Sequence, residues 1–260
     1  MTLRSFLAMV AGIPVVFFIK PFRSGVSWLG IRKSFFPGLF LALTLVFQSY
    51  GLETTTTTNS AFITALYVIF VPLFGALFTK KFPIRSLIWA IIAIAGVGFL
   101  TGTSQVKMNT GDWLTLGCSI AAAIQILVIS KIYENPECHS LSGFTFNWWQ
   151  TIWAGVICLV FAYFRNEKIP FILFNLNFKI VLSLIFIGVF SALCAFGIQV
   201  WAQRILGPNT SSIYYLLEAP FAAVFAYIIF NERFIPMQGF GILIILLACF
   251  GSVYFATDPK

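Results

Sequence analysis

The chain has 260 residues, of which 60% are hydrophobic and only 9% are charged. Soluble domains carry roughly 25% charged residues, and the mean hydropathy of this chain is +0.95. These values argue against a soluble globule and exclude a disordered chain or a disulfide-stapled secreted fold. A bilayer takes about 20 apolar residues per helix, so the length leaves room for roughly eight to ten spans. The composition predicts an all-α polytopic membrane protein.

The net charge of +8 comes from 16 Lys and Arg against 8 Asp and Glu. The basic residues lie in short loops between apolar runs, which is typical of membrane topology and not of a nucleic-acid surface. Cys138 and His139 are neighbours in a loop, but one Cys and one His do not make a metal site. The five cysteines form no close pairs, and we expect packing residues and not disulfides. We predict no nucleic acid partner, no metal and no cofactor.

Nine apolar segments follow one another along the chain. They are too long and too continuous for the alternating strands of a membrane barrel, so all nine are predicted to be helices. Their approximate bounds are Ser5–Ile19, Phe35–Gly51, Ser60–Thr79, Ser86–Gly102, Trp113–Ser130, Gly143–Phe164, Ile180–Trp201, Ser211–Phe230 and Met237–Ala256.

The loops between these segments predict an orientation. Basic residues, including Arg23 and Lys80, follow the first and third segments, whereas the loop 52–59 contains none. Because cytoplasmic loops are enriched in Lys and Arg, we expect Arg23 and Lys80 in the cytoplasm and Thr56 outside. Counting onward puts the C-terminal Lys260 in the cytoplasm and the first residue outside.

The second half of the chain repeats features of the first at an offset of 151 residues. The offset aligns Phe47-Gln48-Ser49-Tyr50 with Ile198-Gln199-Val200-Trp201, and it matches Ser60 to Ser211, Leu66 to Leu217, Phe70 to Phe221 and Phe74 to Phe225. Segments two to four thus pair with seven to nine. Paired segments are five apart, an odd number, so the copies run in opposite directions. Such inverted repeats are typical of secondary transporters, whose substrate site lies near the midplane between the repeats.

Several stretches resemble the EamA-type transporters of the drug/metabolite transporter superfamily. The stretches that carry the resemblance are Gly51-Leu52-Glu53-Thr54-Thr55, Asn59-Ser60-Ala61-Phe62-Ile63-Thr64, Phe70-Val71-Pro72-Leu73, Gly111-Asp112-Trp113-Leu114, Trp201-Ala202-Gln203-Arg204, Leu216-Leu217-Glu218-Ala219-Pro220 and Asn231-Glu232-Arg233. Their order and spacing cover nearly the whole chain.

The resemblance implies ten helices in two EamA repeats, both termini in the cytoplasm, and a central cavity. It implies a permease or exporter that moves a small metabolite, such as an amino acid or related compound, across a bacterial cytoplasmic (inner) membrane. The first repeat would be residues 1–105, with four helices, and the second residues 111–257, with five.

The chain departs from the family pattern in three places. The family's first helix has no counterpart, and from this we expect the 260 residues to be a truncated reading. Lys80-Lys81 replaces the usual acidic residue of the first repeat, so only the second keeps it, as Glu232. The Pro that normally follows the intramembrane Glu directly stands one residue later, as Pro220.

Glu218 is the one acidic residue within a predicted span. A charge at a helix centre costs about 2.5–3.5 kcal/mol on insertion scales, and such residues usually face a cavity or a partner. Glu218 is therefore a candidate to bind a cation or amine or to take up a proton. The alternative is a protonated carboxyl that holds the bundle together, for example by a hydrogen bond to Gln199.

The other candidate cavity residues are neutral and polar: Gln48, Gln125 and Gln199, with Tyr67, Tyr214 and Tyr215. The glutamines could bind a substrate amide or carboxylate, or join helices to one another. The tyrosines suit an aromatic cavity wall, or a lipid-facing or core surface. The cluster Asn147-Trp148-Trp149-Gln150 is more simply explained by an interfacial aromatic belt, and the Thr54–Thr58 run by capping of the third segment together with Asn59.

Three classes of function were weighed. An integral-membrane enzyme needs clustered carboxylates, histidines or a metal near the interface, and the chain has one His and one acidic residue within a span, so we expect no catalytic residues. A non-transporting helper, or an inactive remnant of a transporter, stays open because of the absent helix. The sequence favours a secondary transporter that works by alternating access, with lipid and a small metabolite as its partners.

Overall fold

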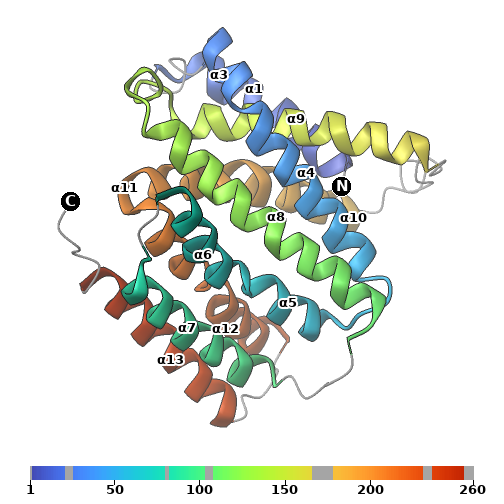
Figure 1. The fold of residues 1–260 in the computed structure, drawn as a ribbon. Helices are drawn as coiled ribbons and strands as arrows, with labels where there is room; N and C mark the ends of the chain where they lie inside the picture. The colour runs from blue at the N-terminus through green and yellow to red at the C-terminus, as the bar shows by residue number, and fades with distance from the viewer. Residues whose placement is uncertain are drawn as a thin grey trace. The chain divides into compact units, whose positions relative to one another are not determined.

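The computed structural model describes residues 2–20, 26–79, 82–102, 108–165, 178–230 and 236–254, and within these ranges it is helical with no strand (Figure 1). In chain order the helices are α1 (Thr2–Phe18), α3 (Trp28–Lys33), α4 (Phe35–Gly51), α5 (Thr57–Ala65), α6 (Tyr67–Thr79), α7 (Ile84–Thr101), α8 (Thr110–Tyr133), η1 (Pro136–Cys138), α9 (Gly143–Phe164), α10 (Phe178–Ile185), η3 (Phe186–Ala195), α11 (Phe196–Tyr215), α12 (Glu218–Phe230) and α13 (Pro236–Tyr254).

The described helices are those of a polytopic membrane protein. Six helical stretches are long and apolar enough to cross a bilayer, and two shorter apolar helices cover Arg4–Phe18 and Phe35–Gly51. A helix lies within each of the nine predicted segments, and α4 and α9 have the predicted bounds. The all-α membrane class is therefore confirmed. The number of membrane-spanning helices and the two repeats stay predictions.

The structure differs from the predicted segments in local detail. The third segment is two helices, because α5 ends at Ala65 and α6 begins at Tyr67. Ten residues of the seventh segment, Phe186–Ala195, wind as a π-helix. The boundary between segments seven and eight falls at Gly207, whose φ of 75° and ψ of 172° interrupt α11. Glycine adopts this backbone without strain, and Pro208 then suits the first position of the next helical stretch.

Thr56 caps the start of α5, as the sequence predicts. Its hydroxyl accepts a hydrogen bond from the Asn59 N–H at 3.1 Å, and its backbone is extended. A side-chain oxygen in this position satisfies one of the orphan N–H groups of the first helical turn.

The chain divides into two compact units. Unit 1 comprises residues 1–46 and 128–205, and unit 2 comprises residues 47–127 and 206–260. Each unit takes helices from both halves of the sequence.

Unit 1 has a core in which α1, α9 and η3 pack together. Trp148 of α9 is buried, and its indole N–H donates to the Met9 carbonyl at 3.0 Å. Asn147 is fully buried, and its amide donates to the carbonyls of Ala192 and Leu193 in the π-helix, at 3.0 and 3.2 Å. The interfacial-belt interpretation is therefore wrong for Trp148. Asn147 supplies donors for the π-helix carbonyls, and Asn147, Trp148 and Gln150 are buried, whereas Trp149 is partly buried.

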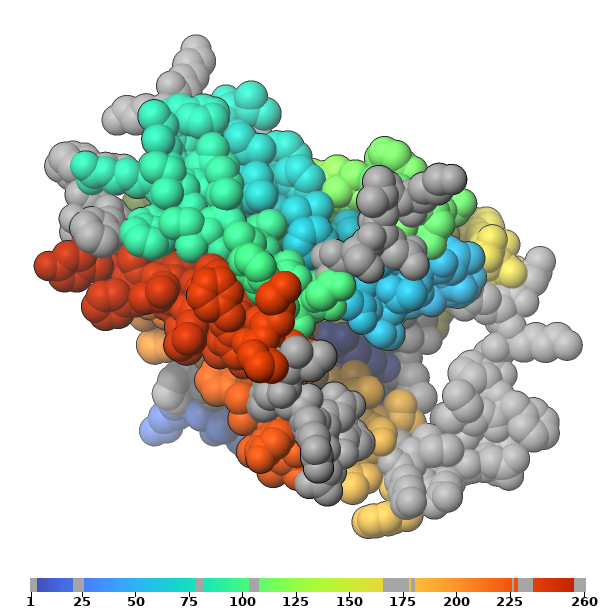
Figure 2. All heavy atoms as spheres, turned by 90° about the horizontal axis from the view of Figure 1, so that it is seen from below, coloured from blue at the N-terminus to red at the C-terminus, as the bar shows by residue number. Residues whose placement is uncertain are grey.

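Unit 2 is built around α7 and α13, which lie side by side along their length (Figures 1 and 2). A Cβ at Gly251 would meet the Trp89 ring, and one at Gly241 would meet the backbone of Leu100. As the residue number rises along α7 it falls along α13, so the two helices are antiparallel. The small residues let the two backbones come close, as in other membrane helix pairs.

All five cysteines are free, and Cys118, Cys138, Cys158 and Cys249 are buried. Four of the five cysteines therefore pack in the interior, as the sequence predicts. Burial raises the pKa of the Cys138 thiol, with Lys33 acting in the opposite direction. A thiol with a raised pKa is a poor nucleophile, which fits a packing role.

Candidate functional site

A one-residue break within unit 2 separates α5 from α6 at Leu66. Its φ of −60° and ψ of −14° stay in the helical region, and Thr57–Leu77 together form one candidate membrane span. The Leu66 N–H donates to the Ile63 carbonyl at 3.2 Å, and the Leu66 carbonyl accepts from the Phe70 N–H at 3.2 Å. From α8, the Ser119 hydroxyl donates to the Thr64 carbonyl at 3.0 Å. Broken helices are tolerated at membrane depth where side chains satisfy the freed backbone groups, and Ser119 does this here.

A second break in unit 2 lies at Leu216 and Leu217, before α12. The Leu217 N–H donates to the Tyr214 carbonyl at 3.0 Å, and the Leu217 carbonyl accepts from the Phe221 N–H at 3.1 Å. Pro220, the third residue of α12, has no N–H and cannot be part of a continuous ladder across this point. The Cys249 thiol lies 3.6 Å from the Ile213 carbonyl and donates to it.

Both breaks belong to one packed cluster of unit 2. Its buried members include Ala65 and Val68 around the first break, and Ile213 and Leu216 around the second. We call residues 65–67 and 214–218 together the double break. Because both breaks pack into one core, the polar side chains next to them lie in one region of the unit.

The three predicted tyrosines are part of this region. Tyr67 and Tyr214 pack against the cluster that holds the double break, and Tyr67 and Tyr215 pack against a second cluster formed by Val71, Ala123 and Ile126. The structure therefore brings the tyrosines of the third and eighth predicted segments together.

Glu218 stands at the second break, as the first residue of α12 and exposed. The sequence predicts it inside a continuous span, whereas the structure puts it in a first helical turn, where unpaired N–H groups favour a negative charge. The Tyr67 hydroxyl is within electrostatic range of the Glu218 carboxyl and the Tyr215 hydroxyl. The double break thus combines one carboxylate with phenolic hydroxyls.

The three predicted glutamines are distributed over both units. Gln125 of α8 is buried in unit 2, next to Ile126, which packs with Tyr67 and Tyr215. Gln48 of α4 belongs to unit 2 and Gln199 of α11 to unit 1, and both are partly buried. Among the described residues, no group of three or more His, Cys, Asp or Glu side chains is arranged to hold a metal ion.

A polar network that the sequence analysis missed closes one end of unit 2. Asn109 and Asp112 form a reciprocal capping box at the start of α8: the Asp112 N–H donates to Asn109 Oδ1 at 2.8 Å, and the Asn109 N–H donates to Asp112 Oδ2 at 2.9 Å. The Thr55 hydroxyl donates to Asp112 Oδ1, and the Asn109 amide donates to the Thr54 carbonyl at 2.9 Å. The signal was present in the sequence, since Asn followed three residues later by an acidic side chain marks a helix start.

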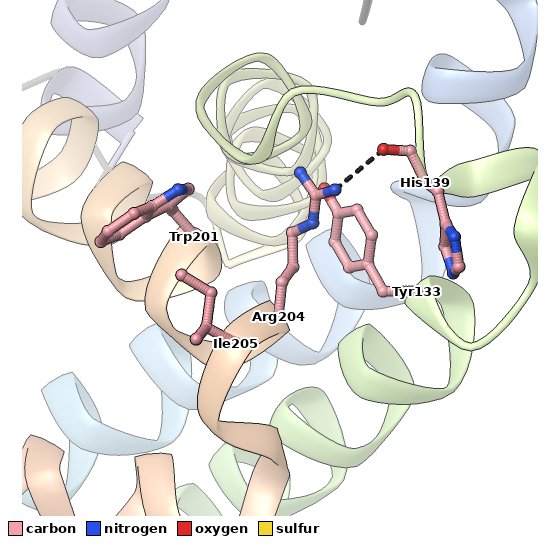
Figure 3. A pocket seen from close by; sticks show the side chains of 5 residues that line it. All are labelled: Tyr133, His139, Trp201, Arg204 and Ile205. Carbon is pink, nitrogen blue, oxygen red and sulfur yellow. Dashed lines mark hydrogen bonds between the residues drawn. The ribbon is translucent and has the colours of Figure 1, made fainter.

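Unit 1 contains a pocket of about 380 Å³, lined by Tyr133, His139, Trp201, Arg204 and Ile205 (Figure 3). From the sequence, Trp201 and Arg204 were predicted only as part of a family motif, and His139 only as a residue that cannot hold a metal with Cys138 alone. The spacing of Trp201 and Arg204, three apart on a helix, was the signal that they share a face.

Comparisons with known proteins agree with this architecture. A family model described as the EamA-like transporter family matches residues 109–254. A protein from Archaeoglobus fulgidus named as an uncharacterized transporter is 31% identical over 248 residues, which cover 95% of this chain and 73% of that protein. A protein of the same description from Methanothermobacter thermautotrophicus is 25% identical, with 96% of this chain and 76% of that protein covered.

A solved crystal structure has a TM-score of 0.71 to this chain, covering 98% of this chain and 85% of the other, at 10% sequence identity. At that identity the likeness shows the fold alone. The family model spans more than half of the chain, and the first relative above is covered over more than two thirds of its length. The chain therefore belongs to the EamA-like transporter family.

Proposed function

We propose that this chain is a secondary transporter that moves a small metabolite carrying an amino group, such as an amino acid, by alternating access, and that the double break forms part of its substrate site. The observation that carries this proposal is the equivalence of the two breaks. Leu66 and Leu217 are 151 residues apart, the offset of the internal repeat, and each is followed four residues later by a Phe whose N–H it accepts. Interrupted helices at corresponding positions of two repeats point to transporter binding sites.

The chemistry of the double break supports an amine. A carboxylate at the break, Glu218, would pair with an ammonium group, and the tyrosines around it would supply aromatic walls and hydroxyl groups that fix orientation. Gln125, a buried amide on α8 of the same unit, is a further candidate to bind a carboxylate or carbonyl of the substrate.

The antiparallel packing of α7 against α13 supports the inverted repeat, since the 151-residue offset pairs these two helices and an odd spacing of segments requires opposite directions. We further propose that the two EamA repeats are residues 1–105 and 111–257, and that the protein lies in the cytoplasmic membrane with its C-terminus in the cytoplasm. Arg23, Lys80, Lys81, Glu232, Arg233 and Lys260, on which parts of these proposals rest, lie outside the described residues.

Counterflow into proteoliposomes tests the proposal. Purified protein is reconstituted with one unlabelled compound inside, and entry of the same compound in labelled form is followed. Amino acids, simple amines and organic acids are tested in turn. We expect exchange for one or more amino-bearing compounds above protein-free vesicles. Exchange of organic acids alone would contradict the substrate class, and no exchange of any compound would favour a non-transporting helper.

A further inference from the structure

We propose that the pocket of unit 1 between the end of α8, η1 and α11 binds the phosphate of an anionic phospholipid headgroup. The pocket belongs to a different unit from the double break. The ligand is assigned by three features of the pocket wall: a fixed guanidinium, polar side chains beside it, and an apolar stripe next to its mouth.

The guanidinium of Arg204 is held in place by groups that do not neutralise it. Nη1 donates to the Leu141 carbonyl at 3.0 Å and Nη2 to the His139 carbonyl at 2.8 Å, and the ring of Tyr133 lies 4.5 Å from the guanidinium carbon (Figure 3). Among the described residues, no carboxylate forms an ion pair with it. These contacts use two of the five N–H groups of an arginine. An immobilised, uncompensated guanidinium is the group that proteins use for phosphate.

Two polar side chains line the pocket beside Arg204. The Tyr133 side chain is 7% exposed, and its hydroxyl has no hydrogen-bond partner in the structure. A buried polar group without a partner is costly, and it often marks the place of a missing ligand. His139 is exposed and lines the same pocket. A phosphate oxygen beside the guanidinium could accept from both side chains.

An apolar stripe of α11 continues from the pocket. Ile198, Trp201 and Ile205 are 63%, 57% and 65% exposed, and their spacing of three and four residues puts them on one face of the helix. Trp201 and Ile205 also line the pocket. A soluble phosphate compound needs no such stripe, whereas an acyl chain would lie along it. The combination of charge and stripe therefore favours a lipid over a free phosphate.

The pocket also lies at the end of a predicted span, since Tyr133 is the last residue of the apolar helix 110–133. Headgroup phosphates are at this level of a bilayer, and Trp and Tyr side chains are enriched there. Basic pockets at helix ends on the cytoplasmic side bind anionic headgroups, and the loop charges predict that this end is cytoplasmic.

Native mass spectrometry of the detergent-purified protein tests the proposal directly. The wild-type chain is titrated with dioleoyl phosphatidylglycerol, with dioleoyl phosphatidylcholine, and with inorganic phosphate or glycerol 3-phosphate as soluble competitors. We expect phosphatidylglycerol to be retained severalfold more tightly than phosphatidylcholine. Both lipids carry the phosphate, but the positive choline group of phosphatidylcholine is repelled by the guanidinium. Inorganic phosphate or glycerol 3-phosphate should displace it only weakly.

Three variants assign the binding to this pocket. Arg204→Gln should weaken phosphatidylglycerol binding about tenfold or more, and His139→Ala, at an exposed position, should weaken it severalfold. Tyr133→Phe keeps the ring against Phe146 and removes only the hydroxyl without a partner. It should weaken binding severalfold without lowering the melting temperature. Arg32→Gln, which removes the same charge at an exposed residue of α3 that does not line the pocket, should bind as wild type.

Three results would overturn the proposal. Equal retention of the two lipids by the wild-type protein would show that the pocket does not select an anionic headgroup. Unchanged phosphatidylglycerol binding in both Tyr133→Phe and His139→Ala would show that the lipid does not bind in this pocket. If inorganic phosphate displaces bound phosphatidylglycerol as readily as added phosphatidylglycerol does, the ligand is a soluble phosphate compound.

Discussion

Leu66 and Leu217 interrupt two helices in the same way: each donates its N–H to the carbonyl three residues before it, at 3.2 and 3.0 Å, and each accepts from the Phe four residues after it, at 3.2 and 3.1 Å. The flanking residues of both breaks pack into one buried cluster of unit 2. The two breaks thus share position, hydrogen bonding and core, which is why we give them a functional meaning.

Pro220 stands at the second break, and its replacement should affect transport. At the equivalent position of the first break Ile69 donates its N–H to the Leu66 carbonyl at 2.9 Å, so Pro220→Ala restores a donor that the proline lacks. Because the first break persists with Ile69 at this position, we expect the second break to remain, with one added hydrogen bond at the start of α12. The melting temperature should be unchanged or higher, and the stiffer helix start should reduce transport severalfold in counterflow. Pro37→Ala, at the third residue of α4 as Pro220 is at the third of α12, should transport normally. Equal activity of both variants would mean that Pro220 has no role in transport.

Packing of α7 on α13 should not tolerate a methyl group at Gly241. A Cβ there would lie 2.6 Å from the Gly96 carbonyl oxygen and 2.6 Å from the Leu100 nitrogen, both backbone atoms that cannot move away alone. Gly241→Ala should therefore destabilise the protein by about 1–3 kcal/mol, seen as a lower melting temperature in detergent. Gly239→Ala on the same helix, where a Cβ meets nothing within 4 Å, should be neutral or slightly stabilising. Similar melting temperatures for the two variants would contradict this packing.

The capping box at the start of α8 should contribute measurably to stability. Asp112→Ala removes the acceptor for the Asn109 N–H and the Thr55 hydroxyl. The free energy of unfolding should fall by about 1–3 kcal/mol, because a helix cap and its charged hydrogen bonds are lost. Glu134→Ala removes a carboxylate from an exposed pair with Lys131, whose side chains are 66% and 78% exposed, and should change stability little. Thermal unfolding in detergent compares the two, and an equal effect would show that the network is not stabilising.

Topology can be tested at two exposed residues, Thr58 and Ser140. In a background with the five cysteines replaced, Thr58→Cys should react with an impermeant maleimide from outside intact cells, and Ser140→Cys only after the membrane is opened. The reason is the excess of basic residues on the predicted cytoplasmic side. If both label from the same side, the predicted orientation is wrong.

Much of the helical architecture could be predicted because it depends on long apolar runs. The bounds of α4 and α9 match the predicted segments, and Thr56 caps α5 as expected. The break at Leu66 could not be predicted, because no proline stands beside it. The hydroxyl that donates a hydrogen bond to the Thr64 carbonyl belongs to Ser119, which is 55 residues away in the chain. The inward role of Trp148 was missed for the same reason: its partner is a carbonyl of α1, far away in the chain.

The candidate site was predicted in part. Tyr67, Tyr214 and Tyr215 were predicted because they lie on two segments that the repeat pairs, and they pack around one region. The place of Glu218 at the start of a helix could not be predicted from its position in an apolar run. The pocket around Arg204 arises from a loop that folds back to supply two backbone carbonyls. Contacts of this kind leave no periodic pattern in a sequence.

The central claim is that Glu218 at the double break binds the amino group of the substrate. The most direct measurement is counterflow of the transported compound by Glu218→Gln beside Glu53→Gln, which removes an exposed carboxylate from the loop after α4. The amide keeps the size of the side chain but loses the charge that pairs with an ammonium group. At equal amounts of protein in the vesicles, we therefore predict a flux at least about tenfold lower than wild type for Glu218→Gln. The flux of Glu53→Gln should be near that of the wild type. Wild-type flux by Glu218→Gln would contradict the claim.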